Sequence, residues 1–375
     1  MRILYIFRSL AVWGGIERVL VEKMNHLYTM YGYDVFMLTT EQGNHPVPYQ
    51  LEDAIHLEDL GIQFHKQYQY HGIRRLWEAY KRSCLFEKRL FAQINIICPD
   101  IIVCTTSDPV NSIAKVKGGI PLIVESHSVF SRTFGERGIR KRYVDYLLGR
   151  GIKKANCVIT LTISDAIEWR KVYQHVDVIP NIVHLNKGLI SSQNNKRVLF
   201  VGRFDYQKRV SEIIEIWRML QTDFPDWELH IYGDGDQRKE LLKAVHEHRD
   251  SIIIHKPTSS IFDCYINSAF LVMTSLFEPF GLVMPEAMSC GLPVISYDVP
   301  YGPASIIAEG IDGFLIKNND RKAFADKMAL LMRNIELRQQ MGKQAVLSAQ
   351  RYSADNIMPM WKKLFEELYV SSSNY

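Results

Sequence analysis

The sequence predicts an α/β protein built from two consecutive domains, each with a parallel sheet covered by helices. Short apolar segments rich in Val and Ile alternate with longer segments of helical periodicity, which is typical of this class. The alternation stops in the polar stretch 184–196, which we interpret as a linker, and then restarts. With 375 residues, of which 47% are hydrophobic and 23% charged, the chain is long enough to bury two cores.

The first domain is expected to span residues 1–180. Its predicted strands are almost entirely apolar, as is usual for parallel strands that are buried on both faces. They are RILYIF, DVFMLTT, DIIVCTT, PLIVES and CVITLT. The helices between them are expected to begin near Ile16, Gly72, Pro109, Glu136 and Asp165.

The second domain is expected to span residues 181–354. From about residue 320 the periodicity is helical, and the segment 355–375 is expected to cross back onto the first domain. The predicted strands of the second domain are RVLFVG, WELHIYG, SIIIHK, AFLVMTS, LPVISYD and GFLIK.

Composition narrows the class of protein. The six cysteines form no CxxC pair and no metal-ligand spacing, which favours reduced thiols and a cytoplasmic location. Arg8 interrupts the first apolar run, so a strand fits that run better than a signal peptide does. No run reaches the roughly 18 apolar residues that a membrane span needs.

Positive charge is concentrated in the first half of the chain. Residues 70–154 contain 16 Lys or Arg and 7 Asp or Glu, whereas residues 181–375 contain 22 and 23. Such a field attracts nucleic acid, an anionic membrane or a phosphorylated substrate, unless it is only a solvated helix face. Because no nucleic-acid motif is recognised, we expect no nucleic-acid partner.

Two glutamates interrupt the apolar segment TSLFEPFGLVMPEAMSCGLPVIS at 274–296. A buried carboxylate without a partner is costly, so Glu278 and Glu286 should reach solvent or a ligand. We predict a strand, a turn and a helix that stops at Gly291, with the helix N-terminus near Gly281. The structural alternatives are a capping Glu278 and a solvated Glu286.

A similar strand, turn and helix open the second domain in VLFVGRFDYQKRV. Arg203 follows Gly202 directly, and Lys208 stands at the start of the helical pattern. Together the two cations could hold a diphosphate without a metal ion, or they could be ordinary surface residues. The acidic pair Asp234 and Asp236 resembles a metal-binding motif, but its place after a predicted strand favours a turn.

The two motifs GRFDYQKRV at 202–210 and SLFEPFGLVMPEAMSCGLPVIS at 275–296, in this order, resemble those of the retaining glycosyltransferases of family 4. The segments ANCVITLTISDAIEWRKV, VDVIPNIV and GIDGFLI also resemble parts of that family, so the resemblance covers nearly the whole chain. It implies the GT-B fold of two facing Rossmann-like domains. The first would lie on the acceptor side, and the second would bind the nucleotide sugar.

The resemblance also implies site residues, and neither a metal nor another cofactor. A basic pair would stabilise charge on the leaving diphosphate, while a glutamate and a histidine would lie near the donor sugar. The implied catalytic residues are His127, Arg203, Lys208 and Glu278. The implied donor-binding residues are Gly14, Gly15, Gly202, Phe280, Gly281, Leu282, Val283 and, on the ribose hydroxyls, Glu286.

The segment SYDVPYGPASII at 296–307 resembles a branch of the family that assembles bacterial polysaccharides and lipid-linked oligosaccharides. It implies transfer of a hexose or N-acetylhexosamine from a nucleotide sugar, expected to be a UDP-sugar, to a lipid-linked or soluble glycan acceptor. The alternatives are a UDP-sugar epimerase of the same fold and a non-catalytic nucleotide-sugar binding protein.

A lipid-linked acceptor would bring the enzyme to the inner face of the cytoplasmic membrane as a peripheral protein. Helical periodicity from Gly72 onward gathers apolar side chains on one side of a helix, with basic residues along its flanks. We hypothesise that this helix contacts an anionic membrane surface. The alternative is that its apolar side packs on the sheet of the first domain. The apolar residues are Ile73, Leu76, Trp77 and Tyr80.

Overall fold

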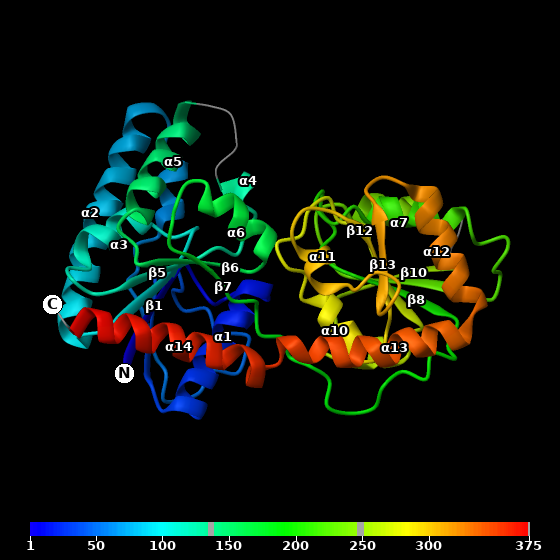
Figure 1. Ribbon diagram of the computed structural model, residues 1–375. Helices are drawn as coiled ribbons and strands as arrows, with labels where there is room; N and C mark the ends of the chain where they lie inside the picture. The colour runs from blue at the N-terminus through cyan, green and yellow to red at the C-terminus, as the bar shows by residue number, and fades with distance from the viewer. Residues whose placement is uncertain (134–138, 246–250, 374–375) are drawn as a thin grey trace. The chain divides into compact units, whose positions relative to one another are not determined.

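The computed structural model describes residues 1–133, 139–245 and 251–373. The chain divides into two compact units: unit 1 is Met1–Ile182 with Ile357–Tyr375, and unit 2 is Val183–Asn356. From the sequence, the boundaries between the two domains are expected after residues 180 and 354. Each unit has the predicted architecture, a parallel sheet covered by helices (Figure 1).

Unit 1 contains the first set of strands and helices. Its strands are β1 (Arg2–Phe7), β2 (Asp34–Thr39), β3 (His56–Asp59), β4 (Ile101–Thr105), β5 (Leu122–Glu125), β6 (Cys157–Thr160) and β7 (Val176–Val178). Its helices are α1 (Gly15–Tyr31), the 3-10 helix η1 (Phe64–Gln69), α2 (Gly72–Ile97), α3 (Val110–Val116), α4 (Phe130–Thr133), α5 (Ile139–Ile152), α6 (Ile163–Arg170) and α14 (Ala354–Ser373).

The described strands of unit 1 form one parallel sheet in the order β3-β2-β1-β4-β5-β6-β7. Helices α1 and α14 lie on one side of it, and α2, α3 and α5 lie on the other (Figure 1). The predicted apolar strands are confirmed as β1, β2, β4, β5 and β6. Helix starts near Ile16, Gly72 and Pro109 are confirmed within one residue, whereas Glu136 lies outside the described residues.

Helix α6 begins at Ile163, two residues before the predicted start at Asp165. The hydroxyl of Thr162 accepts a hydrogen bond from the backbone N–H of Asp165. Thr162 is therefore the N-cap, because its side chain satisfies a donor that the first turn of the helix leaves unpaired.

Unit 2 contains the second set of strands and helices. Its strands are β8 (Arg197–Val201), β9 (Glu228–Tyr232), β10 (Ile252–His255), β11 (Phe270–Met273), β12 (Val294–Asp298) and β13 (Gly313–Lys317). Its helices are α7 (Val210–Arg218), α8 (Arg238–Ala244), α9 (Ile261–Ile266), α10 (Val283–Ser289), α11 (Gly302–Ile306), α12 (Arg321–Arg333), α13 (Ile335–Ala349) and the 3-10 helix η3 (Gln350–Tyr352).

The described strands of unit 2 also form one parallel sheet, in the order β10-β9-β8-β11-β12-β13. All the strands predicted for this domain are confirmed. Helices α7 and α12 lie on one side of the sheet, and α10 and α13 lie on the other (Figure 1). The chain therefore leaves the centre of the sheet after β8, builds one half, and returns to the centre at β11.

The polar stretch 184–196, interpreted as a linker, packs within unit 2 although it forms neither helix nor strand. Gln193 is 3% exposed, and its side-chain amide donates to the carbonyl of Gly291. Arg338 on α13 donates to the carbonyl of Gln193 at 3.1 Å. Polar residues in this stretch thus satisfy buried backbone groups.

Helix α14 returns to unit 1, as the sequence predicts. Trp361 and Phe365 are buried in that unit, and the ring of Trp361 lies 4.0 Å from Lys23 Nζ on α1. This contact explains why the last segment of the chain belongs to the first unit. Among the helices that the structure describes, none is long and apolar enough to cross a membrane.

Candidate functional site

The candidate site of unit 2 lies where β8 and β11 end. These strands are neighbours at the centre of the sheet, and the direction in which strands are added reverses between them. Open α/β sheets bind ligands at the carboxyl edge of such a reversal point. The segment after β8 carries Gly202, Arg203 and Lys208, and the segment after β11 carries Glu278.

An ion pair joins these two segments. Lys208 Nζ lies 2.6 Å from Glu278 Oε2, and the two side chains are 12% and 7% exposed. Ser275 Oγ donates to the same carboxylate oxygen at 3.2 Å. The amide of Gln207 donates to the carbonyl of Phe277 at 3.1 Å and links the segments a second time. The structure therefore brings two of the predicted catalytic residues together.

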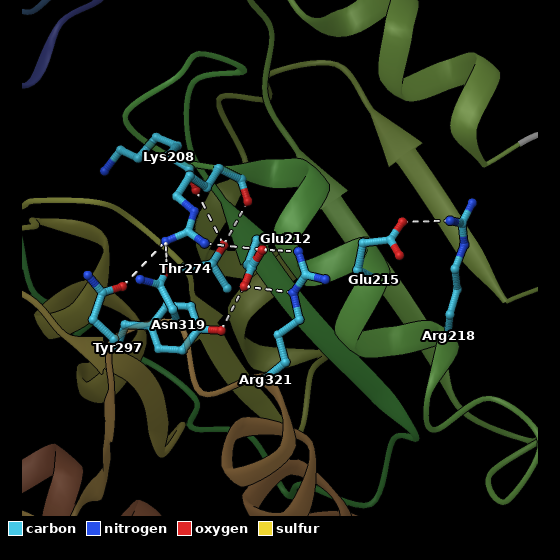
Figure 2. Close-up of polar contacts among 10 residues, drawn as sticks. Lys208, Glu212, Glu215, Arg218, Thr274, Tyr297, Asn319 and Arg321 are labelled. Carbon is cyan, nitrogen blue, oxygen red and sulfur yellow. Dashed lines mark hydrogen bonds and ion pairs between the residues drawn. The ribbon is translucent and has the colours of Figure 1, made fainter.

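The backbone that carries Lys208 is held by the end of β11. Arg209 has φ +50°, a left-handed conformation that non-glycine residues seldom adopt. The hydroxyl of Thr274 contacts the carbonyl oxygens of Lys208, at 3.3 Å, and of Arg209, at 3.0 Å (Figure 2). It stabilises the turn because it adds a hydrogen bond to the backbone just before α7.

A cluster of charged and polar side chains surrounds Glu212 (Figure 2). At its centre the Glu212 carboxylate accepts two hydrogen bonds from Arg321, at 2.7 and 3.0 Å. It also accepts from Tyr297 Oη at 2.9 Å and pairs with Arg209 at 3.1 Å. Burial alone would raise the pKa of Glu212, but these donors lower it. Arg209 is thus held by the fold, whereas Lys208 faces the site.

Arg203 is presented differently. Its side chain is 70% exposed and contacts Asp205 at 3.1 Å and Gln207 at 3.3 Å. Both contacts are within the same loop, and exposed ion pairs contribute little stability. The guanidinium can therefore turn towards an anion at small cost.

The loop after β8 packs closely against the turn after β9. A Cβ at Gly233 would lie 1.9 Å from the carbonyl oxygen of Gly202, and one at Gly235 would lie 2.5 Å from that of Phe204. Glycine is required at both positions because any side chain would collide with backbone. The carbonyl of Asp234 accepts from the N–H of Phe204 at 2.8 Å.

The acidic pair Asp234 and Asp236 lies in this turn, between β9 and α8, which confirms the turn that the sequence predicts. Asp234 Oδ1 accepts from the N–H of Gly235 at 2.9 Å, as a turn-forming aspartate does. Within residues 1–133, 139–245 and 251–373, no group of three or more His, Cys, Asp or Glu side chains could hold a metal ion.

The turn 280–283 leads into α10. Gly281 has φ +94°, and a Cβ there would lie 2.6 Å from the side chain of Met284 and 2.9 Å from Glu278 Cγ. Conformation and space both call for glycine, so the backbone can pass close to the Glu278 carboxylate. Of the other predicted donor-binding residues here, Phe280 is 2% exposed, and Leu282 and Val283 are partly exposed.

Glu286 lies in the first turn of α10 and is 4% exposed. Tyr265 Oη donates to its Oε2 at 3.1 Å, so Glu286 is not a solvated surface residue. Glu278 is not a cap either, because Leu282 occupies the N-cap position of α10 and Glu278 pairs with Lys208. Both structural alternatives for the two glutamates are therefore wrong.

His127 lies in unit 1, just after β5. Its Nε2 is 3.1 Å from Glu125 Oε2, and its side chain is 4% exposed. The other carboxylate oxygen of Glu125 accepts from Lys23 Nζ, which is also buried. Burial alone would raise the pKa of Glu125, but Lys23 and His127 lower it to about 2. An ionised Glu125 therefore orients the imidazole of His127.

Gly14 and Gly15 stand where the loop after β1 enters α1. The backbone of Gly14 is extended, and a Cβ on it would meet only the carboxylate end of Glu17, which can move. Nothing in unit 1 itself calls for glycine at position 14. Close approach of a ligand to this backbone stays a prediction.

Unit 1 also has a cavity of about 320 Å³ that the sequence analysis did not identify. It lies at the carboxyl edge of β1, β2 and β4, where the strand order of this sheet reverses. The Glu41 carboxylate lies 2.6 Å from Arg8 Nε and 3.3 Å from His65 Nδ1. For Arg8 and Glu41 the signal that could have found them is their position directly after predicted strands, whereas His65 lies in η1 and follows no predicted strand.

Asp108 lines the same cavity and is buried. Burial raises its pKa to about 7, although hydrogen bonds from the backbone and hydroxyl of Thr105 oppose the shift. The cavity therefore combines a carboxyl group that titrates near neutrality with the exposed cation Arg8 and the aromatic residues Phe64 and Tyr68. Such a lining can hydrogen-bond hydroxyl groups and stack on a ring.

Two family models match nearly the whole chain between them. The model of Glycosyltransferase Family 4 matches residues 13–187, and that of Glycosyl transferases group 1 matches residues 185–347. An uncharacterized glycosyltransferase of Haemophilus influenzae is 27% identical over 93% of this chain and 95% of its own length. A poly(ribitol-phosphate) alpha-N-acetylglucosaminyltransferase of Staphylococcus aureus is 27% identical over 64% of this chain and 49% of its own length.

Among solved structures, TarM of Staphylococcus aureus, in complex with UDP, has a TM-score of 0.78 at 15% identity. The likeness covers 97% of this chain and 99% of that chain, and at this identity it shows the fold alone. The consecutive family matches agree with the two units and with the two motifs that meet at Lys208 and Glu278. The chain is therefore similar to glycosyltransferases along nearly its whole length and has the GT-B fold.

Proposed function

We propose that the enzyme is a retaining, metal-independent glycosyltransferase that transfers a hexose or N-acetylhexosamine from a UDP-sugar to a hydroxyl of a growing glycan. The observation that carries the proposal is the meeting of Lys208 and Glu278 at the reversal point of the unit 2 sheet. The UDP bound by the structurally similar TarM supports this donor class.

Lys208 and Arg203 would bind the diphosphate of the donor. As the bond between the sugar C1 and the phosphate oxygen breaks, negative charge grows on the leaving UDP. A cation placed there stabilises the transition state more than the bound donor. Lys208 would act from a fixed position, because the fold holds its backbone on both sides. The exposed side chain of Arg203 would turn from solvent towards the diphosphate.

The two glutamates would position the donor. Glu278 would accept hydrogen bonds from hydroxyls of the transferred sugar while staying paired with Lys208. Glu286, which is buried in the first turn of α10, would accept hydrogen bonds from the ribose hydroxyls. Because Lys208 and Ser275 engage Glu278, and Tyr265 engages Glu286, neither carboxylate is suited to attack C1.

This arrangement favours a front-face substitution over a double displacement. The acceptor oxygen forms a bond to C1 on the face from which UDP departs, so the anomeric configuration is retained. The acceptor proton passes to the leaving phosphate oxygen. His127, oriented by the ionised Glu125, would hydrogen-bond a sugar hydroxyl.

The cavity of unit 1 would take the glycan acceptor, because its carboxylates, its guanidinium and its aromatic rings suit sugar hydroxyls and faces. The S. aureus relative named for poly(ribitol-phosphate) supports a polymer as the acceptor class. We further propose that the acceptor is lipid-linked, which would make the enzyme a peripheral protein of the inner face of the cytoplasmic membrane.

Donor and acceptor assays test the proposal. The purified chain is incubated with UDP-glucose, UDP-galactose or UDP-N-acetylglucosamine, with and without a glycan acceptor, and UDP release is measured. Acceptor-dependent release, and a product whose anomeric proton by NMR has the configuration of the donor, are expected. An isomerised UDP-sugar without acceptor would instead identify an epimerase. Donor binding without release under any condition would identify a binding protein.

A further inference from the structure

The first half of α2 presents an exposed apolar surface. Spacings of three and four residues place its members on one face of the helix. Their exposed fractions are 86% for Ile73, 66% for Leu76, 55% for Trp77 and 69% for Tyr80. The alternative that this side packs on the sheet is therefore wrong. The buried residues of α2 begin only at Phe86, and its first turns extend beyond the sheet of unit 1 (Figure 1).

A row of cations runs along one flank of this face. Arg74, Lys81 and Lys88 are exposed and stand seven residues apart, or about two turns, so they project in nearly the same direction. Lys81 Nζ lies 3.8 Å from the centre of the Trp77 ring, so cation and ring form one surface. Lys81 lies 3.9 Å from Glu78, a long contact, and Glu78 also pairs with Arg82 at 3.8 Å, so it neutralises the row only in part.

We propose that the α2 surface, made of Ile73, Leu76, Trp77 and Tyr80 with the three flanking cations, docks on an anionic lipid bilayer. Aromatic and aliphatic side chains of this kind enter the headgroup region, while Lys and Arg remain at the charged lipid heads. Charge complementarity selects this partner, because the centres of protein interfaces are depleted in lysine.

The start of α2 contacts the lining of the cavity of unit 1. Tyr68 lines that cavity, and the guanidinium of Arg75 on α2 lies 4.2 Å from its ring centre. Helical spacing puts Arg75 on the side of α2 opposite to Trp77, so a glycan carried by a membrane lipid would have to pass around α2 to reach the cavity. This last step rests on the proposed function, because it takes the acceptor to be a lipid-linked glycan, whereas docking itself does not.

Vesicle co-sedimentation of the full chain tests the docking. At low ionic strength the protein should pellet with vesicles of phosphatidylglycerol and phosphatidylcholine in equal parts, and stay in solution with pure phosphatidylcholine. Salt should release it as screening shortens. The variant R74E/K81E/K88E should bind at least about 100-fold more weakly, because each cation near an anionic surface contributes about fivefold. L76S/W77S should lose about tenfold or more, through lost apolar burial.

Matched variants in unit 2 are the controls. K187E/K322E/K343E changes the net charge equally and should keep the affinity of the unchanged chain, as should L347S, whose leucine is 65% exposed on α13. Thermal unfolding of every variant shows whether the fold is intact. Equal binding to neutral vesicles, equal losses in the control triple variant, or a solution dimer that W77S dissociates would overturn the proposal. Vesicle binding without glycosyl transfer would overturn the proposed function and leave docking supported.

Discussion

Lys208 and Glu278 are separated by 70 positions in the sequence, yet Lys208 Nζ lies 2.6 Å from Glu278 Oε2. With side chains only 12% and 7% exposed, each charge depends on the other for stabilisation. The same two residues are the ones proposed to face the leaving phosphate and the sugar. Variants here are therefore expected to change stability and catalysis together, and the two effects must be separated.

Lys208→Met should lower the free energy of unfolding by about 3 kcal/mol, because it leaves the mostly buried Glu278 carboxylate without its counter-charge. The double variant Lys208→Met/Glu278→Gln should recover part of that loss. Urea unfolding of the unchanged chain, of Lys208→Met and Glu278→Gln alone, and of the double variant gives the coupling free energy. Strictly additive losses would mean that the two charges do not interact in solution.

Arg203→Ala isolates function from stability. Because the side chain is 70% exposed, the free energy of unfolding should change by less than about 0.5 kcal/mol. Turnover with a UDP-sugar should fall by about 10 to 1000-fold, since a donor to developing charge is lost. The control is Arg218→Ala, whose partner Glu215 lies on the same helix, α7 (Figure 2). Unchanged turnover in Arg203→Ala would remove this residue from the mechanism.

Substitution of Glu286 should impair donor binding, whereas substitution of Glu278 should impair turnover. Glu286→Ala should weaken the binding of UDP itself by about tenfold or more, because a buried acceptor for the ribose hydroxyls is lost. Glu278→Ala should mainly reduce turnover and discrimination between sugars. Calorimetry with UDP and with the UDP-sugar on both variants distinguishes the roles. The reverse pattern would show that the two assignments are exchanged.

Metal independence is tested by chelation. If Arg203 and Lys208 alone neutralise the diphosphate, EDTA should leave UDP release unchanged, and added Mg²⁺ or Mn²⁺ should not increase it. Activity that EDTA abolishes and Mg²⁺ restores would contradict the metal-free mechanism. The UDP affinity measured with and without EDTA shows whether such an effect acts on binding.

The stability conferred by Glu125 should depend on acid pH. Its pKa is about 2 in the folded chain, against an ordinary value of 4.5, so the unfolded chain binds the proton more tightly. The contribution, on the order of 3 kcal/mol, is therefore complete above about pH 4.5 and disappears as the pH falls towards 2. Thermal unfolding should show Glu125→Gln well below the unchanged chain at neutral pH, with the gap closing in acid. The exposed Glu367→Gln serves as control; a constant gap would contradict the shift.

Much of the fold could be predicted from the sequence because buried parallel strands are apolar throughout. The strands that were missed are β3 and β7, the two edge strands of the unit 1 sheet. β3 reads HLED and is mostly exposed, so its pairing with β2 decides its conformation, and composition carries little signal. β7 has only three residues, and they lie in the segment VDVIPNIV, which the sequence identifies only through its family resemblance.

The site could be predicted only as far as local motifs reach. Gly202, Arg203, Lys208 and the two glutamates stand in contiguous patterns that a single sequence displays. The partners that hold them do not. Glu212, which pairs with Arg209 beside Lys208, is held by Arg321 across 109 positions. Glu125, which orients His127, is held by Lys23 across 102. Such contacts depend on which loops meet at a sheet edge, which periodicity does not specify.

The return of α14 has a consequence for how the chain folds as it is synthesised. Unit 1 starts the sequence but includes Ile357–Tyr375, so the ribosome completes unit 2 first. Until Trp361 and Phe365 emerge, Lys23 and the apolar surface beneath them lack their aromatic cover. The usual order of N-terminal domain first is thereby reversed for the final packing step. Proteolysis after Asn356 would then damage the half of the enzyme that lies farthest from the cut in sequence.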